Sequence, residues 1–112
     1  MARADEAKAI NSLIAEIDSA VKANKPHMLS LITINTDVAG TTLEQEKSRT
    51  GFSYGEVYVA HSIALASHKT FDQIAAVKAK GSSWAQIAQM NKVRLRGSAA
   101  LLKEMREKKK DQ

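Results

Sequence analysis

The sequence contains no cysteine, which excludes disulfide bonds, thiolate metal sites and cysteine nucleophiles. It also has only one proline and five glycines among its 112 residues. Both of these residues weaken helices, whereas alanine, which is abundant here, has the highest helix propensity. The scarcity of helix breakers therefore predicts an all-α fold.

Aromatic residues are also scarce, at 4% of the chain, so Ala, Ile, Leu and Val must fill most of the core. Apolar residues make up 44% of a chain whose length suits a single domain. We therefore predict one helical domain over residues 1–112, made of five to seven short helices. Its first element is a long N-terminal amphipathic helix over residues 4–24.

Long hydrophobic runs are missing too. No run reaches the roughly 18 apolar residues that cross a bilayer, and no segment resembles the apolar core of a signal peptide. The sequence therefore predicts no membrane span. Two locations remain open: exported (periplasmic or secreted) if a leader was removed from ahead of Met1, and cytoplasmic otherwise.

Positive charge is concentrated at one end of the chain. Basic and acidic residues cancel over residues 1–91, so the net charge of +5 is carried by residues 92–112. This asymmetry predicts an anionic partner. The alternative interpretation is a solvated C-terminal helix that frays into a mobile basic tail over residues 104–112. The side chains expected to bind the partner are Lys92, Arg94, Arg96, Lys103 and Arg106.

The N-terminal helix is predicted from the spacing of its apolar residues. Ile10, Ile14, Ile17 and Val21 follow one another at intervals of four, three and four, which places them on one helix face. The same spacing suits pairing with a second copy, so a homodimer through this helix is predicted. Pro26 ends or interrupts the helix.

The apolar run over residues 28–34 is compatible with a strand or a buried helix, and its position between helices favours the helix. Further along, four capping-box patterns occur, in which Ser or Thr is followed three residues later by Glu or Gln. These pairs are Thr42 with Gln45, Ser53 with Glu56, Thr70 with Gln73, and Ser83 with Gln86. They predict helices over residues 42–49, 53–67, 70–80 and 83–91, and a last helix is expected over 98–109. Gly40, Gly51 and Gly81 precede three of these starts, where a preceding helix needs a left-handed residue.

Metal chemistry is not expected. His61 and His68 lie about two helical turns apart, roughly 10 Å, and cannot grip one ion. We expect His61 to be half-buried and hydrogen-bonded, and His68 to cap a helix. No metal and no cofactor is predicted.

Catalysis is not expected either. Residues 51–55 have the spacing of a nucleophile elbow without its strand-to-helix context. Ser53 is better explained as a helix cap, and Gly55 as a point where another backbone packs closely. The macrodipole explains Glu44, Glu46, Glu56 and Asp72 near helix starts. We predict that the chain is not an enzyme; the remaining catalytic hypothesis uses His61 and Glu56.

Residues 71–109 raise the possibility of nucleic-acid binding. The helix from Phe71, the turn at Gly81 and the helix containing Trp84 resemble the first two helices of a helix-turn-helix domain. However, residues 94–97 lengthen the next turn, and the last helix carries Glu104 and Glu107 without side chains suited to reading base edges. Nonspecific phosphate contact is therefore the alternative function. Trp84 itself is expected in the core.

Between residues 36 and 103 the chain resembles a group of short exported bacterial proteins of uncharacterised function. The resembling segments are 50–57 (TGFSYGEV), 69–72 (KTFD), 81–84 (GSSW), 87–88 (IA) and 93–95 (VRL). The relatives carry a signal peptide, and they have Gly-Lys at positions 68–69 and Gly-Lys-Gly-Trp at 81–84. The resemblance implies an envelope or secreted location, which disfavours DNA as partner, and it brings no activity or catalytic residue.

These observations together predict a non-enzymatic helical binding or structural module. Its partner is either an unidentified anion bound by the basic C-terminal helix or another protein. The alternative is a nucleic-acid-binding protein that uses residues 71–109.

Overall fold

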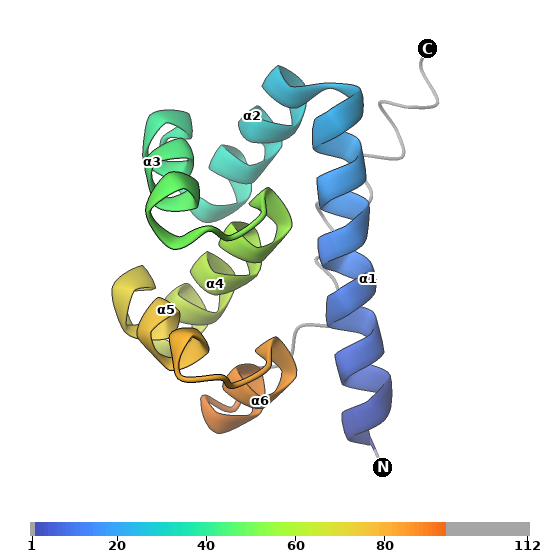
Figure 1. Ribbon diagram of the computed structural model, residues 1–112, viewed down its shortest axis with the longest axis vertical. Coiled ribbons are helices and arrows are strands. Elements are labelled where there is room, and N and C mark those ends of the chain that lie inside the picture. Colours follow the sequence, from blue (N-terminus) through green and yellow to red (C-terminus); the bar gives the residue numbers. More distant parts are fainter. Residues whose placement is uncertain (1, 94–112) are drawn as a thin grey trace.

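The computed structural model describes residues 2–93, and the side chains of residues 7–93, as six helices with no strand among them (Figure 1). This confirms the predicted all-α single domain. The helix predicted over residues 98–109 and the tail over 104–112 lie outside the described residues. The helices are α1 (Ala2–Ala23), α2 (Lys25–Thr36), α3 (Gly40–Thr50), α4 (Tyr54–Ser67), α5 (Phe71–Ala79) and α6 (Trp84–Met90).

The long helix α1 lies along one side of the five shorter helices (Figure 1). Helix α4 is central, because it contacts each of the other five described helices. Its sequence explains this position: Val57, Val59, Ala60 and Ile63 are all buried, although they point in different directions around the helix. A helix that is apolar on every side is stable only when it is surrounded.

The apolar stripe of α1 supplies a second part of the core. Ile10, Leu13, Ile17 and Val21 are buried, and Ile14 is partly buried against the same cluster. Each such side chain contributes roughly 1.5–3 kcal/mol when it is removed from water. The stripe is therefore used within the domain, where α1 contacts α2, α4 and α6. The homodimer predicted from this stripe stays a prediction.

The apolar run over residues 28–34 is helical, as expected. Asn24 caps α2 by accepting a hydrogen bond from the His27 backbone N–H, at 3.3 Å, and Pro26 occupies the first turn. Proline fits there because its missing N–H would have no helical partner in any case. Pro26 thus marks the start of α2 directly after α1 ends.

Three of the four predicted capping boxes are confirmed, at Ser53, Thr70 and Ser83. The fourth is wrong: α3 begins at Gly40 with Ala39 as its cap, so Thr42 lies inside the helix. The role predicted for Gly40 is wrong as well. The left-handed residue that ends α2 is Asp37, with φ 60°, a conformation that aspartate tolerates better than most residues.

The other predicted helix ends are confirmed. Gly51, at φ 78°, ends α3, and Gly81, at φ 106°, follows the end of α5. His68 caps the end of α4 in a left-handed conformation, as expected. The helices predicted over residues 4–24, 42–49, 53–67, 70–80 and 83–91 therefore agree with the structure to within two residues at each end.

Gly55 is the point of close approach between α1 and α4, as predicted. A Cβ atom at this position would lie 2.5 Å from the Ile14 carbonyl oxygen and 2.8 Å from its Cα atom. The Gly55 N–H donates to the Asp18 carboxylate at 2.7 Å. A side chain at position 55 would force the two helices apart.

In the part of the chain that the structure describes, no helix has the length and apolar character needed to cross a membrane.

Candidate functional site

Of the five predicted anion-binding residues, the structure describes Lys92. It is exposed and adopts a left-handed conformation, φ 58°, just after α6 ends at Met90. The next residue, Val93, is buried, and its backbone N–H donates a hydrogen bond to the Ala88 carbonyl at 2.8 Å. This bond fixes the position of Lys92. Arg94, Arg96, Lys103 and Arg106 lie outside the described residues.

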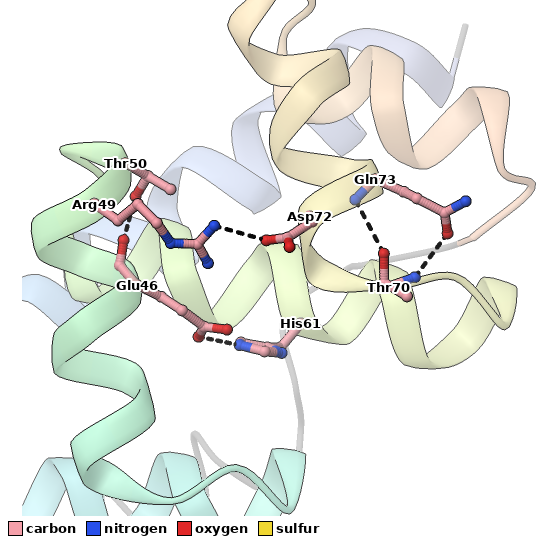
Figure 2. A network of polar contacts seen from close by, with 7 residues as sticks. All are labelled: Glu46, Arg49, Thr50, His61, Thr70, Asp72 and Gln73. Atoms are coloured by element: carbon pink, nitrogen blue, oxygen red, sulfur yellow. Dashed lines mark hydrogen bonds and ion pairs between the residues drawn. The ribbon is translucent and has the colours of Figure 1, made fainter.

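A polar network joins α3, α4 and α5 (Figure 2). At its centre the His61 Nε2 atom lies 2.5 Å from Oε1 of Glu46, and the two side chains are only 12% and 10% exposed. Burial of such groups is costly unless each satisfies the other. The expectation of a half-buried, hydrogen-bonded His61 is therefore confirmed.

An aromatic ring and an ion pair extend this network towards α5. The His61 ring stacks on Phe71, with ring centroids 4.6 Å apart and an interplanar angle of 24°. Arg49 donates to Asp72 at 3.0 Å and lies 6.0 Å from the centre of the Phe71 ring. Because Arg49 and Asp72 are 57% and 70% exposed, that ion pair contributes little stability by itself.

The macrodipole interpretation holds for two of the four carboxylates. Glu56 and Asp72 lie in the first turns of α4 and α5. It is wrong for Glu44 and Glu46, which lie beyond the first turn because α3 starts at Gly40. The buried partnership of Glu46 with His61 was missed, since the two residues are fifteen positions apart and share no local pattern.

The network contains an imidazole and a carboxylate, as the catalytic triad of a serine hydrolase does. Its two threonine hydroxyls, however, form hydrogen bonds with backbone groups. Thr50 donates its hydroxyl proton to the Glu46 carbonyl at 2.7 Å. The Thr70 hydroxyl accepts from the Gln73 N–H in the capping box (Figure 2). Within residues 7–93 no three His, Asp or Glu side chains are placed to hold a metal ion. The contacts of Glu46 with His61, of Arg49 with Asp72 and of His61 with Phe71 link α3, α4 and α5 to one another.

Glu56 is tied to a different partner from His61. Its Oε1 atom accepts from the Ser53 N–H and its Oε2 atom from the Trp84 indole, both at 3.0 Å. Since Glu56 and His61 are five positions apart on α4, the two side chains point about 140° apart. The structure therefore does not bring the hypothetical pair of His61 and Glu56 together.

Trp84 is in the core, as predicted, with 4% of its surface exposed. Its ring forms an edge-to-face pair with Phe52, with centroids 5.3 Å apart, and Phe52 forms a similar pair with Phe71 at 6.2 Å. Burial leaves the indole N–H in need of an acceptor, which Glu56 supplies. A stacking role towards an external ligand is therefore excluded in this conformation.

A second polar cluster surrounds Tyr54. Its hydroxyl donates to Glu44 at 2.7 Å, Lys25 lies 2.9 Å from the same carboxylate, and the Lys47 ammonium lies 5.1 Å from the ring centre. The hydrogen bond from Lys25 lowers the pKa of Glu44, and the bond to Glu44 raises the pKa of Lys25. Burial, followed by the bond to Glu44, raises the pKa of Tyr54.

The segment that contains most of α5 and all of α6 has no acidic residue. None occurs between Asp72 and Glu104, whereas the described part of this segment carries Lys78, Lys80 and Lys92. Lys78 lies 5.4 Å above the Trp84 ring, and Lys80 and Lys92 are exposed. Of these three lysines, Lys92 alone is among the anion-binding residues predicted from the sequence. The acid-free stretch is the signal that would have added the other two.

Three carboxylates of the described residues each have a hydrogen-bonding partner within the domain. Asp72 accepts from Arg49, Glu56 from Trp84, and Glu46 contacts His61. Lys80, at the end of α5, and Lys92, after α6, are exposed, and the charge of Asp72 beside α5 is offset by Arg49. No protein family model, no curated protein and no solved structure matches this chain.

Proposed function

We propose that this chain is a non-enzymatic helical binding module whose basic C-terminal segment binds an anionic partner. One observation carries the proposal: residues 92–112 hold eight basic and three acidic side chains, which accounts for the net charge of +5. Such a concentration of one charge attracts anions and raises their association rate. Lys92, Arg94, Arg96, Lys103 and Arg106 are the proposed binding residues.

The internal bonding of the domain supports a binding role over a catalytic one. His61 and the buried carboxylate Glu46 are hydrogen-bonded to each other, and Glu56 is used by a helix cap and by Trp84. Catalytic groups need a free position beside them for the reacting atom. In the described part of the chain these groups are used for packing helices.

The proposal is tested by charge removal in the full chain. Arg94, Arg96 and Lys103 are replaced together by glutamine, and the matched control replaces Lys8, Lys22 and Lys69, which are exposed elsewhere on the domain. Binding to heparin, labelled duplex DNA and anionic vesicles is measured at low and moderate salt. We expect R94Q/R96Q/K103Q to weaken binding about tenfold or more, and the control to have a much smaller effect.

Two results would contradict the proposal. One is that the wild-type chain binds none of the three polyanions at low salt. The other is that both triple variants weaken binding equally, because the effect would then reflect only net charge. Circular dichroism of each variant separates loss of binding from loss of folding.

Nucleic-acid binding through residues 71–109 is the second candidate. Helices α5 and α6 pack against each other and are joined by a turn at Gly81, as the first two helices of a helix-turn-helix unit are. This candidate predicts that duplex DNA is preferred over vesicles of comparable charge. The exported location implied by the resemblance predicts the opposite preference, together with the protein's recovery outside the cytoplasm of its native cell.

A further inference from the structure

We infer that the α5–α6 unit itself contacts the phosphate backbone of duplex DNA, through Lys78, Lys80 and Lys92. This inference rests on the proposed function: it names the partner and adds two binding residues on the folded body of the domain.

Residues 73–93 carry a net positive charge. The stretch from Gln73 to Val93 includes three lysines and no acidic residue. The preceding carboxylate in sequence, Asp72, is paired with Arg49, and Glu56 accepts from the neutral Trp84 indole and keeps its negative charge. A phosphate approaching residues 73–93 therefore meets three ammonium groups and no acidic side chain of this segment.

The three lysines lie near the two ends of α6. Lys78 lies at the junction of the two helices, above the ring of Trp84, the first residue of α6. Lys80 ends α5, and Lys92 follows the end of α6. Helix α6 has seven residues and spans about 10 Å. Ammonium groups on flexible stems thus lie at both ends of this helix, and its exposed residues Gln86, Gln89 and Met90 carry no charge.

The distribution of exposed apolar residues favours DNA over a membrane surface. Helices that bind membranes lay an exposed apolar face into the lipid. The exposed large apolar side chains of the described residues are Ile34, Leu65 and Met90, one each on α2, α4 and α6. None of these helices presents an exposed apolar stripe. Contact with phosphates requires only charge and reach, which the lysines have.

The competing explanation of these lysines is purely structural. A cation near the C-terminal end of α5 interacts favourably with the helix macrodipole, and Lys78 makes a cation–π contact with Trp84. Both effects would change thermal stability and would leave DNA binding untouched. Stability and binding must therefore be measured on the same variants.

The experiment compares K78Q/K80Q with K8Q/K22Q in the full chain. Both variants lose two positive charges, and the control lysines are exposed on α1. Fluorescence anisotropy of labelled duplex DNA is recorded over a series of salt concentrations. The slope of log K against log salt is negative, and each lost phosphate contact reduces its magnitude by about 0.9. We expect K78Q/K80Q to reduce the magnitude of the slope by between about 0.9 and 1.8, and K8Q/K22Q to change it by much less. K78R/K80R, which keeps both positive charges, should show the wild-type slope.

The outcomes separate this inference from the proposed function. An unchanged slope for K78Q/K80Q, with wild-type binding to DNA intact, would overturn the inference and leave the proposed function standing. Binding to anionic vesicles or heparin without binding to DNA would do the same. A wild-type chain that binds none of the three would overturn both.

Discussion

At the scale of single residues, the structure depends on a few positions where the side chain, or its absence, leaves little choice. Gly55 is one, because the backbone of α1 occupies the space where a Cβ atom would stand. Gly55→Ala should destabilise the domain by about 2 kcal/mol, as overpacking typically does. Urea denaturation followed by circular dichroism measures the change.

The matched control for this substitution is Gly40→Ala. A Cβ atom at Gly40 meets nothing within 4 Å, and its φ is not left-handed, so alanine should be neutral or slightly stabilising. Equal destabilisation by both substitutions would show that α1 and α4 do not touch at Gly55.

Glu46 and His61 form the most buried polar pair described. Glu46→Ala leaves the imidazole without its partner, and we expect a loss of about 2–3 kcal/mol in the free energy of unfolding. Glu46→Gln keeps an amide oxygen and nitrogen for His61 and should cost about 1 kcal/mol. A double-mutant cycle with His61→Ala measures the coupling. A coupling energy near zero would mean that the two side chains do not interact in solution.

Tyr54 provides a test by pH. Glu44→Gln removes the carboxylate that helps to raise the pKa of Tyr54, so the pKa of this phenol should fall. It should stay above its ordinary value, because burial is the larger cause. Alkaline titration of phenolate absorbance measures the change, with Glu16→Gln on α1 as a control of equal charge. A Tyr54 pKa that does not respond to Glu44→Gln would contradict the hydrogen bond.

The same cluster sets the sign of a small acid effect. The pKa of Glu44 is lowered by Lys25, so its contribution to stability is complete above the ordinary pKa of glutamate. That contribution is lost as the pH falls through the lowered value. Both groups are exposed, so salt should weaken the effect.

At the scale of elements, the helix starts separate into those fixed by a side chain and those fixed by packing. Ser83→Ala removes a cap whose oxygen accepts from the Gln86 N–H at 3.1 Å, and it should cost about 1 kcal/mol. Thr42→Ala, at a capping-box sequence that lies inside α3, should change stability by less than about 0.5 kcal/mol. Thermal unfolding of both variants tests this, and equal losses would mean that Thr42 caps α3 after all.

This contrast shows what sequence patterns could and could not predict. Capping boxes and the α1 stripe are local, so the helices and the buried face of α1 followed from them. The start of α3 did not, because α3 begins at Gly40 with no side-chain cap to announce it. Nor did the contacts of Glu46 with His61 and of Glu56 with Trp84, which join residues fifteen and twenty-eight positions apart. Only the folded chain brings such partners together.

At the scale of the whole molecule, charge and packing are distributed differently. The core takes side chains from all six described helices, with the largest shares from α4 and α1, whereas the net positive charge lies at the C-terminal end of the sequence. Neutralising basic residues after Val93 should therefore change affinity for polyanions and leave the unfolding temperature of the helical body nearly unchanged. A large fall in that temperature would mean that the C-terminal segment is part of the core.

The central position of α4 has a consequence for how the domain opens. Every other described helix rests on α4, so its backbone amides become accessible to solvent only when the whole assembly comes apart. In native-state hydrogen exchange, the slowest amides of Val59, Ala60 and Ile63 should report the full free energy of unfolding. The amides of α6, a short helix at one side of the assembly, should exchange through smaller openings (Figure 1). The domain would then come apart from its edges, with α4 as the last segment to lose protection.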